Sequence, residues 1–337
     1  MGTNLACRKA TALYNFDYTS LIELLITERI KMNDKGFFRE IIDHYLQKID
    51  IKENTKRSYG KMLSQYADFA DTLPNLPTRQ DVISYREKLK TRLKAASVQK
   101  HIVVIRGFYR WYYIEGFGPN AAEAIKGMKI ESDFKRESLS LEAATKLLNR
   151  AKRYSNKSIS GKRDYALIAL LLTTGLRTIE VERADVGDIS FVDETKVLYI
   201  MGKGHDEKDA YVKLSPEVYS LIEDYLIDRQ DEYKPLFINH TKPYLGTRLR
   251  TRMISMIVKE MLREIGIDDP KYSAHSLRHT AASLALDLGG DLDAAQQLMR
   301  HKDISTTKIY AHRLSKAKNH LEWQISTALF STNKKKK

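Results

Sequence analysis

The hydrophobic positions of residues 37–129 recur with the spacing of amphipathic helices. Apolar side chains return every three to four positions, which places them on one face of a helix. Turn residues interrupt the pattern at Pro74 and Pro77, and again at Gly116 and Gly118. We therefore predict a small all-helical domain of four or five helices. Its pattern is carried by Ile41, Ile42, Tyr45, Leu46, Tyr59, Leu63, Tyr66, Phe69, Val98, Ile102, Ile105, Phe108 and Tyr112.

The remainder of the chain mixes helical and strand patterns. Residues 163–173 have almost no polar face, which predicts a buried helix that Gly175 ends. Two β-rich runs, 197–200 and 210–214, flank a Gly-Lys-Gly tip and predict a hairpin. We expect a second domain that is mainly α with a small antiparallel sheet. Its further helices are predicted over 216–225, 248–265, 276–288 and 293–299.

A polar stretch separates the two patterns, and Ser140 behind it is a suitable helix N-cap. A flexible linker there would let two basic domains close round a duplex like a clamp, although an ordinary surface loop is the alternative. The predicted segments are an N-terminal extension of unassigned role at 1–36, a helical domain at 37–129, the linker at 130–138, a second domain at 139–330 and a disordered basic tail at 331–337.

An aromatic cluster crowds the last helical run of the first domain. We expect it to form helix core, with Arg106 and Arg110 on a flank where they could meet phosphates. The cluster consists of Phe108, Tyr109, Trp111, Tyr112 and Tyr113.

Charge narrows the class of partner. Against 43 Asp and Glu the chain has 57 Lys and Arg, a net charge of +14 that favours polyanions, with nucleic acid first. Cys7 is the single cysteine, so an intramolecular disulfide and a Cys-based zinc site are excluded. No apolar run approaches the roughly 20 residues of a membrane span, and no signal peptide is recognisable. We expect a cytoplasmic, nucleoid-associated protein with no membrane partner.

Three short segments carry candidate chemistry. In Thr-Gly-Leu-Arg, Arg177 stands where a helix end turns into a helix start, beside backbone N–H groups that favour anions. Glu180 follows three residues later, so a surface ion pair at helical spacing is the simpler interpretation. In 299–312, Ser305 is a suitable N-cap that would place Tyr310 on a short helix after the loop of His301.

The other segment contains His275, Arg278 and His279, whose spacing puts them on one face of a helix. Two histidines four residues apart invite a zinc interpretation. The HExxH glutamate and an evident third ligand are missing from the sequence, so we expect no metal and a core position for His279.

Together these segments resemble the motifs of the tyrosine-recombinase (phage-integrase) family: TGLR with a glutamate three residues on, HxLRH, and a histidine nine residues before the tyrosine of TTxxY. The resemblance covers residues 37–325. It implies a mainly α, two-domain DNA clamp whose catalytic domain holds a small antiparallel sheet. The matching catalytic positions are Arg177, Lys203, His275, Arg278, His301 and Tyr310, with Glu180 as the supporting acidic residue.

Two positions need separate comment. The family's lysine lies in a β-hairpin turn of variable length; the Gly-Lys-Gly setting favours Lys203, and Lys208 in the same loop is the alternative. Arg300 stands where the family commonly has glycine. A cation there could touch DNA or alter how His301 is presented, so we count Arg300 with Arg106 and Arg110 as predicted DNA contacts.

The resemblance also implies a mechanism without metal, cofactor or ATP. Arg177, Arg278 and His301 would neutralise the scissile phosphate while the tyrosine attacks it, with His275 as candidate base. Lys203 would protonate the leaving 5′ oxygen, which makes a 3′-phosphotyrosine that can be rejoined to a new strand.

Family members act as tetramers on double-stranded DNA with specific recombination sites, so we expect self-association and accessory DNA-bending or directionality proteins. A C-terminal apolar stripe could dock on a neighbour as an exchanged segment, or pack on its own domain. A catalytically silent DNA-binding regulator and a type IB topoisomerase-like enzyme are the alternative functions. The stripe is Leu321, Ile325, Ala328 and Leu329.

Overall fold

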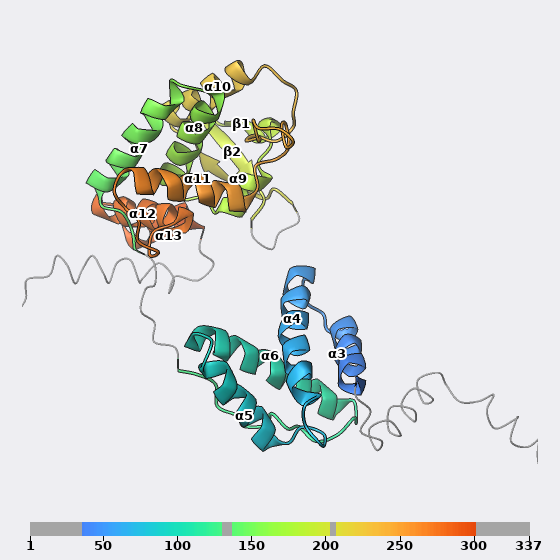
Figure 1. Ribbon diagram of the computed structural model, residues 1–337. Helices are drawn as coiled ribbons and strands as arrows, with labels where there is room; N and C mark the ends of the chain where they lie inside the picture. The colour runs from blue at the N-terminus through green and yellow to red at the C-terminus, as the bar shows by residue number, and fades with distance from the viewer. Residues whose placement is uncertain (1–35, 130–136, 203–206, 301–337) are drawn as a thin grey trace, which may run out of the picture. The chain divides into compact units, whose positions relative to one another are not determined.

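The computed structural model describes residues 36–129, 137–202 and 207–300 (Figure 1). These residues form two compact units, one within 36–129 and one within 137–300. Each unit has its own hydrophobic core. No helix in the described part of the chain is long and apolar enough to cross a membrane.

The first unit is helical throughout its regular structure, as the spacing predicted. A capping box begins α5, because the Thr78 side chain accepts from the backbone of Asp81 and the Asp81 carboxylate accepts from the backbone of Thr78. The helices of the described part are α3 (Phe37–Lys48), α4 (Glu53–Ala70), α5 (Arg79–Lys90) and α6 (Ala95–Ile114).

Aromatic side chains of α3, α4 and α6 form the core of this unit. The Phe38 ring packs against Tyr66 and Phe108, and the hydroxyls of Tyr66 and Tyr109 share a hydrogen bond of 2.8 Å inside the core. Each of these two buried hydroxyls thereby has a partner. The predicted aromatic core is confirmed except at Tyr113, which is 63% exposed because no element of the described residues covers that face of α6.

The second unit is mainly α with one small sheet, as predicted. Helix α8 lies at its centre and packs against α7, α10 and α12 (Figure 1). The helices are α7 (Leu141–Ser155), α8 (Ile159–Thr174), α9 (Thr178–Arg183), the 3₁₀ turn η1 (Val186–Asp188), α10 (Pro216–Arg229), α11 (Thr251–Glu264), α12 (Ala274–Asp287) and α13 (Leu292–Met299).

Burial explains why α8 lacks a polar face. Its side chains from Ala166 to Leu172 are all buried because helices cover it on several sides. The Ser158 hydroxyl caps its start, and Gly175 ends it in the left-handed conformation with φ 60°. A Cβ on Gly175 would lie 2.7 Å from the Met299 methyl carbon, so glycine also permits close approach of α13.

The sheet is antiparallel, with strand order β1 (Ile189–Val192), β2 (Thr195–Ile200) and β3 (Ala210–Lys213). The predicted hairpin is therefore confirmed as β2 and β3. Strand β1 was not predicted, since two of its four residues are exposed and pairing with β2 supplies the missing stabilisation. Helix α12 begins at Ala274, two residues earlier than expected, because Ser273 serves as its N-cap.

Candidate active site

Arg177 is the N-cap residue of α9, and Glu180 holds it there. The backbone N–H of Arg177 donates to Glu180 Oε2 at 2.8 Å, and Arg177 Nη1 donates to Oε1 at 2.7 Å. The simple ion-pair interpretation thus named the right partner but the wrong environment. Glu180 is only 1% exposed, whereas the Arg177 side chain is 28% exposed. The Arg177 guanidinium is therefore held by a buried carboxylate, while another part of it faces solvent.

Glu180 is ionised despite its burial. Burial alone would raise the pKa of its carboxyl group, but the hydrogen bond from the Arg177 backbone and the charges of Arg300 and Arg177 outweigh it. The pKa of Glu180 consequently lies below its ordinary value. A buried carboxylate that stays charged is what orients a guanidinium at neutral pH.

Arg278 joins the same region from α12. Its Nη1 donates to the carbonyl of Gly175 and its Nη2 donates to the carbonyl of Met299. The residue is 2% exposed, so its guanidinium is an internal bridge between the turn after α8 and the end of α13. Arg278 therefore binds the turn that leads directly into Arg177, although the two arginines are 101 positions apart (278 against 177).

The two histidines of the HxLRH motif differ in environment. Their rings lie edge to face with centroids 4.8 Å apart; His275 is exposed and His279 is buried, as predicted for a core histidine. His275 therefore has the access that a base requires. Within the described ranges no group of three His, Cys, Asp or Glu side chains could hold a metal ion.

Arg300 ends α13 with its side chain directed inward. Its Nη2 lies 3.2 Å from Glu180 Oε2, and its Nη1 donates to the carbonyl of Leu298 at 2.8 Å. The side chain is 18% exposed. Sequence reasoning did not foresee this contact; its one signal was an arginine where the resembled family commonly has glycine. The expectation that Arg300 contacts DNA stays a prediction.

Lys208, in the loop between β2 and β3, is bound by two carboxylates. Its Nζ lies 2.9 Å from Asp185 Oδ2 and also binds Asp188 Oδ2. Arg248 donates to the other oxygen of Asp185, which completes the cluster. These contacts give Lys208 a structural role, and the assignment of the catalytic lysine to Lys203 stays a prediction. The predicted site residues Lys203, His301 and Tyr310 lie outside the described residues, as does the C-terminal apolar stripe.

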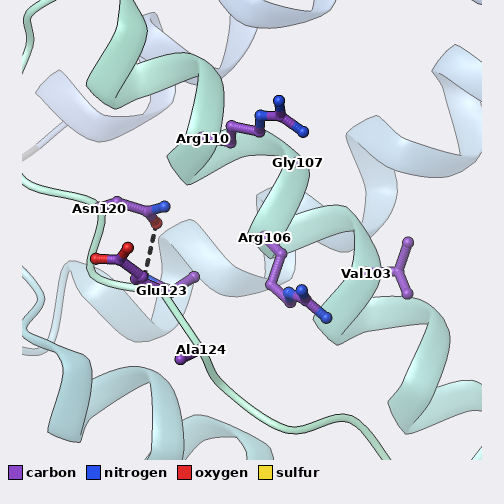
Figure 2. Close-up of a pocket in the computed structure, with 8 residues that line it drawn as sticks. Val103, Arg106, Gly107, Arg110, Asn120, Glu123 and Ala124 are labelled. Carbon is purple, nitrogen blue, oxygen red and sulfur yellow. Dashed lines mark hydrogen bonds between the residues drawn. The ribbon is translucent and has the colours of Figure 1, made fainter.

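In the first unit, Arg106 and Arg110 project from one exposed face of α6 (Figure 2). They border a cavity of about 350 Å³ between α6 and the loop that follows it. On the loop side the Asn120 side chain accepts a hydrogen bond of 3.2 Å from the backbone of Ala122. Two guanidinium groups at successive turns of one helix face suit neighbouring backbone phosphates.

Both units match models of known protein families. The family model described as the phage integrase family matches residues 137–317, and the phage integrase N-terminal SAM-like domain matches residues 42–116. The tyrosine recombinase XerD of Listeria innocua is 27% identical over 294 residues, which are 81% of this chain and 94% of that protein. The tyrosine recombinase XerC of Pelobacter propionicus is 31% identical over 272 residues, covering 78% and 86%.

Solved structures share the fold at low identity. The XerH site-specific recombinase, bound to a palindromic difH substrate in a post-cleavage complex, has a TM-score of 0.68 at 20% identity, with 86% of this chain and 85% of that chain covered. A lambda integrase dimer bound to a COC′ core site has a TM-score of 0.64 at 17% identity, with coverage of 81% and 76%. The chain therefore belongs to the phage integrase family, and it is an enzyme of the tyrosine recombinase type.

Proposed function

We propose that this enzyme cleaves specific sites in double-stranded DNA through a covalent 3′-phosphotyrosine at Tyr310 and rejoins the cut end to a new strand. The observation that supports this most is that Arg278 binds the carbonyl of Gly175, two residues before Arg177, whose own guanidinium is held by Glu180. A phosphodiester is anionic, and its attack builds further negative charge, so a catalyst needs fixed cations at the phosphate.

Arg177 is suited to bind the scissile phosphate directly. Glu180 occupies its Nη1, so the remaining N–H groups of the partly exposed guanidinium can reach a non-bridging oxygen. Arg278 donates to the Gly175 and Met299 carbonyls and holds the turn in place, and its buried positive charge would add to the neutralisation of the phosphate. His301 would add a hydrogen bond from the residue after Arg300.

Tyr310 attacks the phosphorus and the 5′ oxygen leaves. A tyrosine hydroxyl has a pKa of about 10, so a base must take its proton, and exposed His275 is our candidate. Lys203 supplies a proton to the leaving 5′ oxygen. The phosphotyrosine keeps the energy of the broken linkage, so rejoining uses neither ATP nor a metal ion.

The DNA contacts belong in part to the first unit, through Arg106 and Arg110. We place the helical DNA-binding domain at 37–129 and the catalytic domain at 139–330, joined by a linker at 130–138 as a clamp. The lambda integrase tetramer bound to a Holliday junction, 18% identical with a TM-score of 0.62, supports a tetramer on DNA for this chain as well. Exchange of the C-terminal stripe between protomers, and accessory proteins that set direction, are part of the same proposal.

Trapping of a covalent complex tests the chemistry. Binding sites are first selected from a random duplex library and then built as nicked substrates that cannot be religated. Wild type in chelator-containing buffer should form a denaturant-resistant adduct, and Tyr310→Phe should bind equally well without forming it. Tyr113→Phe, which alters an exposed tyrosine of α6, is the matched control and should behave as wild type. Binding by all three proteins with no adduct from any would instead identify a DNA-binding regulator.

A further inference from the structure

Arg300 has a backbone conformation that arginine adopts reluctantly. Its φ of 50° and ψ of 46° are left-handed, a region that is unfavourable for a residue with a Cβ. Glycine and asparagine enter this region readily. The side chain is also largely buried, which is unfavourable for a guanidinium. A specific interaction must therefore compensate for both costs.

The compensating contacts join three segments of the second unit. Arg300 Nη1 donates to Leu298 at the end of α13 and lies 3.5 Å from the carbonyl of Thr174 at the end of α8. Its Nη2 binds Glu180 in α9. The Arg300 Nε is buried and has no hydrogen-bond partner among the described residues. The two terminal nitrogens of the Arg300 guanidinium are thus bound within this unit, one of them to the same Glu180 that holds Arg177.

The two carboxylate oxygens of Glu180 accept hydrogen bonds from different groups of Arg177 and Arg300. Oε2 accepts from the Arg177 backbone and from Arg300, whereas Oε1 accepts from Arg177 Nη1. Arg300 therefore restrains rotation of the carboxylate and keeps Oε1 turned toward Arg177. Burial lowers the pKa of Arg300, Glu180 opposes this shift, and the charge of Arg177 adds to it.

Arg300 also changes the net charge around Arg177. Arg177 and Glu180 alone would form a neutral pair. With Arg300 the three side chains carry a net charge of +1, because one carboxylate serves two guanidinium groups. A phosphodiester carries one negative charge, so Arg300 makes the charge of this cluster complementary to it, in addition to the cation of Arg278.

We propose that Arg300 is a positioning residue of strand cleavage, which acts through Glu180 to orient Arg177 and to leave it electrostatically available to the scissile phosphate. The proposal rests on the proposed function, since Arg177 is there the phosphate ligand. It also replaces direct DNA contact as the role of Arg300.

The test is the single-turnover rate of adduct formation by Arg300→Asn with saturating DNA. Asparagine keeps the left-handed conformation and removes the charge. We expect a rate roughly 10²-fold below wild type, the size of loss that a displaced catalytic group produces, with unchanged DNA affinity. Arg300→Lys should recover part of the rate because it restores charge without the planar fork. Arg252→Asn removes an exposed cation from α11 as the matched control and should leave the rate unchanged.

A substrate with a neutral methylphosphonate at the scissile position separates this role from a purely structural one. Without the phosphate charge, wild type and Arg300→Asn should differ less than threefold. An equal loss on both substrates would overturn the proposal, as would weaker DNA binding with normal cleavage of the bound complex. Thermal unfolding of each variant shows that it is folded. The comparison of wild type with Tyr310→Phe tests the proposed function separately. If wild type forms no covalent adduct, or if Tyr310→Phe forms the same adduct, the proposed function fails, whatever the result for Arg300.

Discussion

Glu180 binds Arg177 twice, through the backbone N–H at 2.8 Å and through Nη1 at 2.7 Å. The first bond caps α9, and the second orients a guanidinium. A single carboxylate therefore caps a helix and orients a guanidinium of the proposed phosphate site. Changes at this residue should affect stability and catalysis together.

Glu180→Gln should lower both. The amide removes the negative charge from between Arg177 and Arg300, which leaves two cations facing each other in a poorly solvated site. We expect a loss of about 3 kcal/mol in the free energy of unfolding, as for other broken buried pairs, and roughly 10²-fold slower adduct formation. Urea denaturation and single-turnover cleavage measure the two effects.

Glu142→Gln is the control for that variant. Glu142 also lies in the first turn of a helix, α7, but it is exposed and pairs with Lys146. Its replacement should change the free energy of unfolding by less than about 0.5 kcal/mol. Equal effects from both variants would show that Glu180 matters as a first-turn acidic residue and not as the shared partner of two arginines.

The leaving-group proton distinguishes Lys203 from Lys208. Lys203→Ala should cleave an ordinary substrate slowly and recover when sulfur replaces the scissile 5′ oxygen, because a thiolate leaves without a proton. Lys208→Met should cleave both substrates at nearly the wild-type rate and lose about 1 kcal/mol of stability from its partly buried contacts with Asp185 and Asp188. If sulfur at the scissile 5′ position rescued Lys208→Met and not Lys203→Ala, the roles assigned to the two lysines would be exchanged.

Salt dependence tests the helical unit. If Arg106 and Arg110 each neutralise one phosphate, each alanine variant should reduce the slope of log K against log salt by about 0.9, with weaker binding to every sequence. Arg39→Ala should leave the slope unchanged, because Arg39 is already paired with Asp68 and Asp71. Fluorescence anisotropy between low and moderate salt gives the slopes; identical slopes for all variants would remove the α6 face from the interface.

His240 should make the second unit sensitive to acid. Burial, with the charges of Arg163 and Arg229, lowers the pKa of His240 from 6.5 to about 4, and its Nε2 lies 3.0 Å from the Tyr225 hydroxyl. The unfolded state then binds the proton more tightly than the folded state. The resulting stability is complete above pH 6.5 and is lost as the pH falls toward 4.

Allowing for partial exposure, we expect that loss to be about 2 kcal/mol. His240→Gln does not titrate, so its unfolding free energy should fall less over the same window. Parallel pH profiles of wild type and variant in urea denaturation would contradict the assignment. Activity at neutral pH should be equal in the two proteins, since His240 lies outside the proposed site.

Local spacing in the sequence determined most of the elements. Periodicity predicted the helices of the first unit, and the missing polar face predicted the buried α8, because burial of apolar surface is recorded directly in residue type. The same rule was wrong at Tyr113, an aromatic residue that no neighbour covers, and it passed over the short, half-exposed β1. Short motifs were enough to predict Arg177, Glu180 and Arg278, since their residue types and spacing are set by chemistry.

Only the tertiary structure decided how these residues are used. Glu180 and Arg300 are 120 positions apart, and Arg278 reaches Gly175 across 103, so no local pattern records either contact. The packing of α12 against α8 and of α13 against α12 brings them together. The sequence alone therefore determined the family and predicted its reactive groups. The fold decided their partners, burial and charge, because those depend on which distant segments share one low-dielectric site.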